Sequence, residues 1–546
     1  MPLITRRRFT STSLAAILGS HGLAKGFAIE LPPEHVAAMR ARTKRIVVQQ
    51  DVHWVMLNYG KLHADDDAPF DPFCKAVFSY VDEPGSQIDA IWWDIGGNAT
   101  GSVYPSKVVP HTAAPLVERW YREGTDWVER LVAATRRRKL EVFWNHRISE
   151  VEVMPQGGLA KEADPLKKQH LDWVVPASWW PHGMWNLASP ELREHKLSVL
   201  REIATLYDLD GIQIDFARHV PCLPVGKQWE LRHHVTEFMR MVRCMTLDIA
   251  KQRGRPFLLA ARVPQNVEGC RADGFDVQTW AQQHLVDVLT LGSRTMDVDV
   301  EGIRKAVGAE VQLQPCFDDH HATDGYRYAP IEVLRGVFAN HLQRGANSVV
   351  TFNWAVATPD VAKTVGGEIA PLTHQIAFKE IGDPNTLAGK DKVFAVERRG
   401  GYPWAEGFFN RNDTAPLPTT LARAAKLTLF ISDAPSPKAS LVLRCIFFQA
   451  DAKDVFELRM NGEPLTISST DPDWKDAQIF SPKPQPASGG KGDYKINPSQ
   501  RLLRIEAAVP DHAWKQGVNA VEIRVTSGTS SVQLERLEAH LNYKSA

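Results

Sequence analysis

Eight short runs of apolar and β-branched residues recur between residues 44 and 354, separated by longer stretches that include amphipathic segments. The runs cover residues 46–51, 88–94, 140–147, 211–216, 257–263, 286–291, 310–316 and 348–353. Strands that alternate with helices predict a parallel sheet, and eight such units predict a closed (β/α)8 barrel of the α/β class. A doubly wound open sheet is the alternative, but no Gly-rich phosphate-binding turn follows the first run. We therefore predict a TIM barrel over residues 29–385.

The helix expected before the fourth run is the most clearly marked one. Ser189 can cap its N-terminus, Pro190 suits the first helical position, and apolar residues then recur with a helical period up to Tyr207. Three other amphipathic segments are expected to be helical, at residues 120–138, 229–253 and 331–344.

The pattern changes after about residue 385. Short alternating runs, without a long helical segment, cover residues 393–397, 426–431, 441–447, 455–459, 502–507 and 520–525. Turn residues such as Asn461-Gly462 separate them, and residues 481–492 form a loop rich in Pro, Gly and Ser. We predict a β-sandwich accessory domain over residues 386–546. It resembles the jelly-roll modules that accompany secreted sugar enzymes, and this resemblance implies a domain that either stabilises the barrel or binds sugar independently.

The N-terminus has the layout of an export signal. Arg6 and Arg7, with Phe9 two places on, precede a mildly apolar stretch at residues 14–19 that is too short to span a bilayer. This order resembles a twin-arginine signal, which is read by the export machinery and does not anchor the protein. We expect a signal peptide at residues 1–28, no membrane anchor, and a periplasmic or secreted protein.

Charge and cysteine content exclude several classes of function. Lys+Arg and Asp+Glu both number 64, so no overall basic field attracts nucleic acid or an anionic membrane. The six cysteines are scattered without a C-x-x-C pair, which predicts neither a zinc ribbon nor a disulfide framework. We expect no cofactor and no bound metal.

In such a barrel the chemistry lies at the C-terminal ends of the strands. In the run at 211–216, Ile212 and Ile214 are expected to face the helices, so Gln213 and Asp215 point inward, with Asp215 at the rim. An inward carboxylate is costly unless it is paired or used, which makes Asp215 the leading candidate. We call this alternation of inward and helix-facing side chains the parity of a strand. The same parity, or a position at a strand end, brings the following residues to the rim: Asp51, Asp94, Asn145, Arg147, Arg262, Arg294, Asp318, Thr351 and Asn353.

A family resemblance is carried by two adjacent phrases, Trp185-Asn-Leu-Ala-Ser-Pro-Glu-Leu-Arg-Glu194 and Tyr207-Asp-Leu-Asp-Gly-Ile-Gln-Ile-Asp215. They resemble the phrase N/D-P-E-x-R followed by Y-D-x-D-G-I-x-x-D of the glycosyl-hydrolase-10-like barrel family. The resemblance covers roughly residues 44 to 355. It implies an exported barrel that hydrolyses glycosidic bonds of a poly- or oligosaccharide.

Two departures restrict the mechanism. Phe216-Ala217-Arg218 follows Asp215, where family members often carry a second Asp and a Tyr. In the chitinase pattern D-G-x-D-x-D-x-E, Gln213 replaces the middle Asp and Ala217 the catalytic Glu. An amylase-like strand would carry Arg at the position of Gln213. Neither mechanism transfers to this chain.

Glycoside hydrolysis requires two carboxyl groups that flank the scissile bond. Asp215 supplies one, and we favour Asp318 for the other because the fourth and seventh strands face each other across the barrel mouth. Asp94, Glu150 and Asp319 are alternatives. We favour Asp318 as nucleophile and Asp215 as acid/base, with the reverse assignment also open. His146 or His320 is a candidate for orienting a carboxylate.

Tryptophans near strand ends point to a sugar substrate, because sugar rings stack on aromatic faces. The best platform candidate is the loop segment Trp179-Trp180-Pro181-His182, and Trp354 follows the eighth run. Trp92 and Trp93 cannot both face inward. The other candidates are Trp54, Trp144 and Trp185. The alternative is that many of these side chains belong to the core.

Two other classes of function remain open. A metal-dependent hydrolase is suggested by Asp51-x-His53, His146 and Asp318-Asp319-His320-His321, although Arg262 and Arg294 stand where amidohydrolase barrels carry His. A non-catalytic carbohydrate-binding protein is the other. The sugar, its linkage and the oligomeric state are also left open.

Overall fold

The fold is described from a computed structural model of the chain. It describes residues 28–64, 68–95, 102–111, 114–149, 151–152, 160–177, 180–216, 219–292, 295–319, 326, 328–355, 357–366, 372–398, 415–421, 424–476, 499–528 and 531–544, with only the backbone of residues 53 and 54. The twin-arginine segment at residues 1–27 and the loop at 481–492 lie outside these residues.

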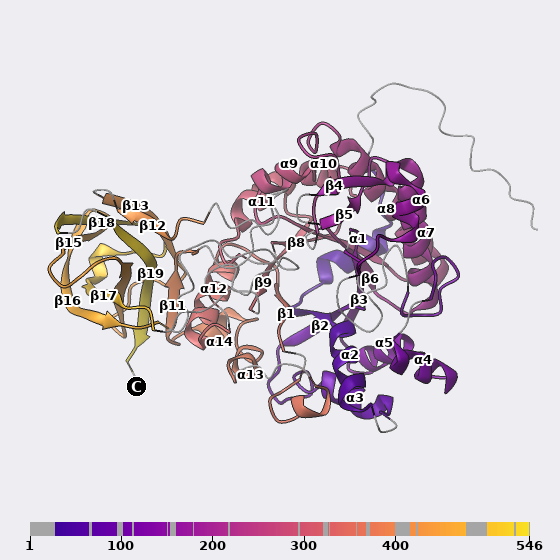
Figure 1. Ribbon diagram of the computed structural model, residues 1–546, viewed down its shortest axis with the longest axis horizontal. Helices are drawn as coiled ribbons and strands as arrows, with labels where there is room; N and C mark the ends of the chain where they lie inside the picture. The colour runs from indigo at the N-terminus through magenta and orange to yellow at the C-terminus, as the bar shows by residue number, and fades with distance from the viewer. Residues whose placement is uncertain are drawn as a thin grey trace, which may run out of the picture.

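Eight parallel strands close into a barrel, which confirms the predicted fold (Figure 1). The order around the barrel is β1-β10-β9-β8-β7-β6-β3-β2, so each strand pairs with the next barrel strand in the sequence and β10 closes onto β1. The strands are β1 Ile46–Asp51, β2 Ile88–Asp94, β3 Glu141–Arg147, β6 Gly211–Asp215, β7 Leu258–Val263, β8 Val288–Leu291, β9 Gln312–Asp318 and β10 Val349–Phe352.

Helices connect the strands, as the amphipathic segments predicted, except that the segment at 120–138 is divided between two helices, Pro115–Arg122 and Trp127–Arg137. The cap at Ser189 is confirmed, because its Oγ accepts a hydrogen bond from the Leu192 N–H at 3.5 Å. The helices are α1 Pro33–Ala41, α2 Val52–Leu62, α3 Phe70–Val77, α4 Pro115–Arg122, α5 Trp127–Arg137, α6 Pro165–Gln169, α7 Pro190–Leu206, α8 Arg232–Arg253, α9 Val267–Asp273, α10 Val277–Gln282, α11 Val300–Val307, α12 Ile331–Gln343, α13 Thr373–Ala377 and α14 Pro384–Leu387. Between β3 and α7 the chain also forms a hairpin of β4 Val174–Ala177 and β5 Trp180–Trp185.

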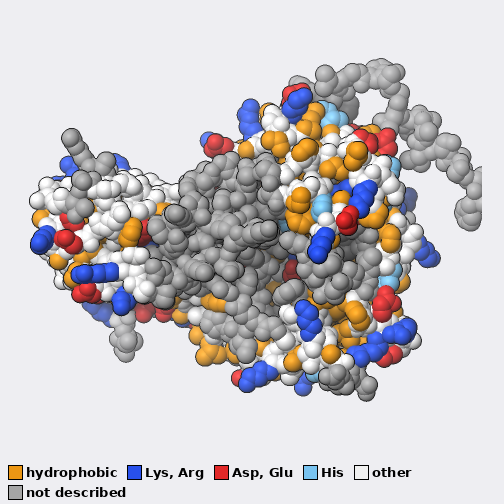
Figure 2. All heavy atoms as spheres, viewed as in Figure 1, with side chains coloured by type: hydrophobic (Ala, Val, Ile, Leu, Met, Phe, Trp, Pro, Cys, Tyr) orange, Lys and Arg blue, Asp and Glu red, His pale blue; other side chains and the backbone are white. Residues whose placement is uncertain are grey.

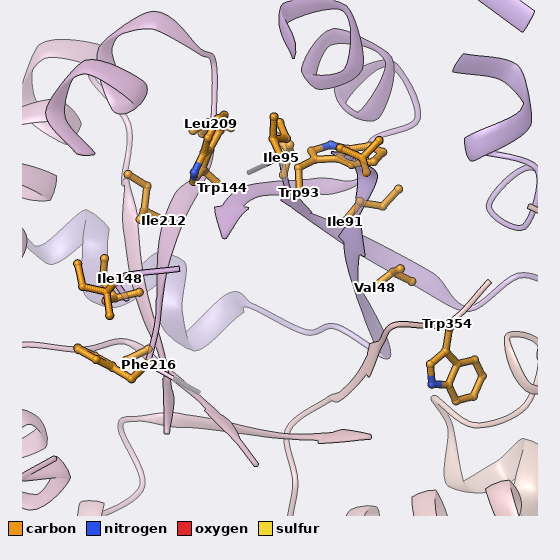
Figure 3. Packing of buried hydrophobic residues seen from close by; sticks show 14 of the residues in the cluster. Val48, Ile91, Trp93, Ile95, Trp144, Ile148, Leu209, Ile212, Phe216 and Trp354 are labelled. Carbon is orange, nitrogen blue, oxygen red and sulfur yellow. The ribbon is translucent and has the colours of Figure 1, made fainter. Parts of the chain in front are cut away.

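Alternate side chains of the strands face the barrel interior and the surrounding helices. The helix-facing set includes Val48, Ile91, Trp93, Trp144 and Ile212, which pack in the large outer core (Figure 3). The interior apolar cluster is a separate one, formed by Met39, Val47, Ala90, Trp92, Phe143, Leu258, Ala260, Val288, Cys316, Val350 and Phe352.

The parity predicted for the eighth strand is wrong. Val350 and Phe352 belong to the interior cluster, so Thr351 between them lies on the helix-facing side. The run 348–353 carries Val, Val, Thr and Phe in succession, and such a run does not mark which face is buried in the barrel.

The N-terminal end of the barrel is closed by α1 and the residues after it. Arg42 donates to both carboxylate oxygens of Glu141 at 2.8 Å and to Gln312 at 2.5 Å, and all three side chains are buried. The packing closes the face opposite to the strand ends that carry the candidate site.

The C-terminal domain is an antiparallel sheet of nine strands that curls around its own hydrophobic core, and it confirms the predicted all-β domain. The strands are β11 Lys392–Ala395, β12 Thr419–Leu421, β13 Ala424–Ile431, β14 Ala439–Phe448, β15 Val455–Met460, β16 Glu463–Trp474, β17 Leu502–Val509, β18 Gly517–Ser527 and β19 Val532–Tyr543. The sequence pattern missed β12, β16 and β19.

The two domains are in direct contact, with α12 packed against β11 (Figure 1). A Cβ atom added to Gly336 of α12 would lie 2.0 Å from the backbone oxygen of Val393, so the helix approaches the strand as closely as glycine permits. Farther along, Tyr326 donates its hydroxyl to Glu538 of β19 at 2.5 Å, and the Arg536 guanidinium lies 4.2 Å from the Tyr326 ring centroid.

Charged side chains of both signs are interspersed on the described surface seen in Figure 2, in keeping with the equal numbers of acidic and basic residues. Within the described residues, no helix combines the length and the apolar character required to cross a bilayer.

Candidate active site

Asp215 ends β6 inside the barrel mouth, where the predicted parity places it. Residue 211, at the start of this strand, must be glycine, because a Cβ there would lie 2.5 Å from both the Leu258 backbone oxygen and the Phe143 ring. Asp215 is 1% exposed, and its Oδ2 accepts hydrogen bonds from Asn145 at 3.2 Å, Gln49 at 3.3 Å and Arg262 at 3.4 Å. Three N–H groups from three other strands therefore converge on one carboxylate oxygen.

A buried amide layer supports Asp215 from below. Gln213 donates to Asn145 at 2.6 Å and to Gln49 at 3.1 Å, and it accepts from Thr290 at 2.5 Å. Gln314 continues the chain by donating to Thr290 at 2.8 Å. Gln213 bonds Gln49 directly and Gln314 through Thr290, so this part of the interior holds its polar groups in fixed positions.

Arg147 connects the ends of β1, β2 and β3. Its guanidinium lies 2.6 Å from Asp51 and 2.7 Å from Asp94. Asp94 is 1% exposed, whereas the Asp51 side chain is 21% exposed and lies nearer the opening. Both rim arginines that the structure describes, Arg147 and Arg262, are thus engaged by carboxylates.

Asp94 and Asp215 share one hydrogen-bond donor. Asn145 Nδ2 lies 3.1 Å from Asp94 Oδ2 and 3.2 Å from Asp215 Oδ2. The two carboxylate oxygens are therefore separated by no more than about twice the longer distance. Since Asn145 uses its other amide atom to accept from Gln213, its rotamer is fixed and so is this separation.

Asp318 ends β9 and is hydrogen-bonded to the end of β10. Asn353 donates to Asp318 Oδ2 at 2.9 Å, and Asp318 is 1% exposed. Asn353 follows β10 with φ of 56°, in the left-handed region that Asn adopts more readily than most residues. This turn brings Asn353 to Asp318 although the parity of β10 differs from the prediction.

Asp319 forms a buried pair with His374 of α13. The two side chains are fully buried, and His374 Nε2 lies 2.5 Å from Asp319 Oδ2. Burial raises the pKa of Asp319, opposed by the hydrogen bond from His374. The His374 ring stacks on Trp354 with centroids 4.4 Å apart, so Trp354 faces α13.

His146 lies on the other face of β3 from Asn145 and Arg147. It is 1% exposed, and burial together with the nearby charge of Lys196 lowers its pKa to about 3, which keeps the ring neutral. It does not contact the rim carboxylates, so the expectation that it orients one of them is not met by its position.

The described tryptophans named as sugar platforms are all buried. Trp180 starts β5 rather than lying in a loop, is 5% exposed, and donates to Glu152 at 2.6 Å. Trp92 stacks on Phe143 inside the barrel, and Trp93 faces the helices, so the two do point in opposite directions. Trp144, Trp185 and Trp354 are each at most 5% exposed.

The structure thus places most of the candidate residues in two hydrogen-bonded groups at the C-terminal ends of the strands. The first group is Asp51, Asp94, Asn145, Arg147, Asp215 and Arg262, and the second is Asp318 and Asn353. Arg294, Glu150, Ala217, Arg218, Trp179, His320, His321 and the side chains of His53 and Trp54 lie outside the described residues. Sequence reasoning missed His374, for which the only signal was a histidine in a short helix after the last barrel strand.

Over the part of the chain that the structure describes, no group of three or more His, Cys, Asp and Glu side chains is placed to hold a metal ion.

No protein-family model matches the chain, and no curated protein matches it either. Similar solved structures include a chitinase from Bacillus thuringiensis (9% identity, TM-score 0.37, covering 90% of this chain and 100% of the other). An alpha-L-fucosidase from Vibrio sp. strain EJY3 has 10% identity, a TM-score of 0.36, and coverage of 96% and 99%. A cycloisomaltooligosaccharide glucanotransferase from Paenibacillus sp. has 8% identity and a TM-score of 0.34, with 92% of this chain spanning 57% of that one. The resemblance to the glycosyl-hydrolase-10-like family stays a prediction.

Proposed function

We propose that this protein hydrolyses glycosidic bonds of a poly- or oligosaccharide, with Asp215 and Asp318 as its carboxyl pair. The observation that carries the proposal is the convergence of Asn145, Gln49 and Arg262 on Asp215 Oδ2 at the C-terminal end of the barrel. Donors aimed at a carboxylate stabilise its charged form. An anion held in this way suits the stabilisation of an oxocarbenium-like transition state.

We assign Asp215 as the anionic member, either nucleophile or stabiliser, and Asp318 as the proton donor. This reverses the assignment favoured from the sequence. Asp318 accepts from the neutral amide of Asn353, and the carboxyl group of Asp319 follows it in the chain. A neighbouring carboxyl group disfavours a second negative charge, which suits a group that must carry a proton.

The engagement of Arg147 and Arg262 by carboxylates favours a neutral glycan as substrate. An acidic or sulfated glycan would need a cation that is not already neutralised. Arg147 and Arg262, the two rim arginines among the described residues, are each within ion-pair distance of an aspartate.

The direct test is the release of reducing sugar from a panel of polysaccharides, with and without EDTA. The wild type and Asp215→Asn are compared with the control Asp89→Asn. Asp89 pairs with Arg45 near the N-terminal end of β2, away from the candidate site. We expect EDTA-resistant release that Asp215→Asn abolishes and Asp89→Asn retains.

Other outcomes point elsewhere. Release that EDTA removes would favour a metal-dependent hydrolase. Full release by Asp215→Asn would refute the site. Tight glycan binding without release from any substrate would favour a carbohydrate-binding protein.

We also propose export by the twin-arginine route, on the strength of Arg6, Arg7 and Phe9 in the sequence. The test is fractionation of cells that express the full chain or the variant with both arginines changed to Lys. Export is expected for the first only, and equal export of both would contradict the proposal.

A further inference from the structure

His374 connects the ends of two neighbouring barrel strands. Its Nδ1 accepts the backbone N–H of Ala355 at 3.2 Å, which leaves Nε2 as the nitrogen that donates to Asp319. Ala355 follows β10 and Asp319 follows β9. One buried ring thus bonds the side chain of the residue after β9 and the backbone three residues after β10.

The first route from His374 to the candidate acid passes along β9. Asp319 is held by His374 on Oδ2 and by the Ala329 N–H on Oδ1 at 2.9 Å, and the Tyr328 N–H bonds its backbone oxygen at 2.9 Å. Asp318 is the residue before this fixed point. Its backbone therefore has little freedom to rotate.

The second route passes along β10. Two contacts hold Trp354 in place. Its ring stacks on His374, and its Nε1 donates to the Phe317 backbone oxygen at 3.2 Å. Asn353, immediately before it, is in the left-handed conformation that directs its amide to Asp318 Oδ2. Holding Trp354 therefore holds the hydrogen-bond donor of Asp318.

Both routes meet at the same carboxyl group. We propose that the buried Asp319–His374 pair is a positioning device that fixes Asp318, through the β9 backbone and through Trp354 and Asn353, in its catalytic orientation. This inference rests on the proposed function, in which Asp318 donates the proton. Neither His374 nor Asp319 needs to touch substrate.

The test compares His374→Phe with a matched change at the far end of the barrel. His35 and Asp287 form another buried pair, 2.9 Å apart, and His35 belongs to α1. Both His374→Phe and His35→Phe are expected to lower the melting temperature. Only His374→Phe is expected to lower kcat, by about 10- to 100-fold with little change in KM, and to move the limb of the pH profile that reports the acid.

A conservative rescue separates positioning from packing. His374→Gln keeps a side-chain N–H near the place of Nε2, whereas His374→Asn is too short to reach Asp319. We expect the Gln variant to retain most of kcat and the Asn variant to lose it. If the His374→Phe variant does not fold, the comparison of the Gln and Asn variants still tests the positioning role.

Crystal structures of the variants give a readout that does not need activity. In His374→Asn the Asn353–Asp318 contact, 2.9 Å in the wild type, is expected to open beyond hydrogen-bond distance. Equal kcat in the His35 and His374 variants, or an unchanged contact in the crystal, would overturn the positioning role. A wild type that releases no sugar would refute the proposed function instead, and the crystal structure would still decide the positioning role.

Discussion

Arg262 and Asp215 form an ion pair inside the barrel in which both side chains are fully buried and a guanidinium nitrogen lies 3.4 Å from the carboxylate oxygen. The guanidinium also lies 4.2 Å from the Phe352 ring centroid and bonds Gln49. The pair therefore has little water to replace a missing partner. Its integrity matters for stability as well as for the proposed chemistry.

Removing the cation leaves a buried carboxylate uncompensated. We expect Arg262→Ala to lower the free energy of unfolding by about 3–5 kcal/mol, the usual cost of breaking a buried pair. Arg45→Ala breaks the partly exposed pair with Asp89 and is expected to cost no more than about 1 kcal/mol. Urea unfolding measures the free energy of unfolding of both variants. Similar losses in the two would contradict the burial of the Arg262–Asp215 pair.

A second prediction concerns pH and the junction of the two domains. Glu397 follows β11, and Thr295, in the segment after β8, donates to it at 2.5 Å. Burial raises the pKa of Glu397 to about 8. Between about pH 4.5 and about pH 8, Glu397 is therefore protonated in the folded state and ionised in the unfolded state. The contribution of Glu397 to the free energy of unfolding is complete below that window and is lost as pH rises through it.

Glu397→Gln removes this titration while keeping a similar shape. We expect the melting temperature of the wild type to fall relative to that of Glu397→Gln as pH rises across the window. Scanning calorimetry at several pH values measures the difference. A constant difference would show that Glu397 has no raised pKa.

A third prediction tests the contact between the domains. Gly336→Ala would place a methyl group 2.0 Å from the Val393 backbone oxygen, and we expect a loss of roughly 1–3 kcal/mol or more from overpacking. Gly60→Ala, in the interior of α2, meets the side chain of Leu116 at 3.3 Å and is the matched control. The control is expected to be near neutral or slightly stabilising, because Ala favours the helix. Equal melting temperatures for the two variants would contradict the close approach of α12 to β11.

The barrel was predictable because its strands are compact runs between turn signals. The ranges 46–51 and 88–94 match β1 and β2 at both ends, and the alternation in β6 placed Asp215 inward. In β10 the successive residues Val349 to Phe352 suit either face, so the parity was wrong there. Strand β16 was missed because Pro464 and Pro472 interrupt it and it is largely polar.

The site was predictable in composition but not in its connections. Position at strand ends identified Asp94 and Asn145, yet nothing in the sequence shows that Asn145 bridges Asp94 and Asp215. His374 was missed because its partner Asp319 lies 55 residues away and the pair forms only when α13 folds back to the end of β9. The burial of Trp180 likewise depends on the β4–β5 hairpin, which the pattern did not predict.

The central claim is that Asp215 is the anion and Asp318 the proton donor of a glycosidase, and leaving-group dependence tests it most directly. On the substrate identified in the panel, kcat is measured for Asp215→Asn and Asp318→Asn against the natural glycan and its nitrophenyl glycoside. A nitrophenolate departs without protonation, so Asp318→Asn should lose about 10²–10⁴-fold on the glycan and far less on the nitrophenyl glycoside. Asp215→Asn should lose activity on both. Retention of nitrophenyl glycoside hydrolysis by Asp215→Asn, with its loss in Asp318→Asn, would contradict the assignment.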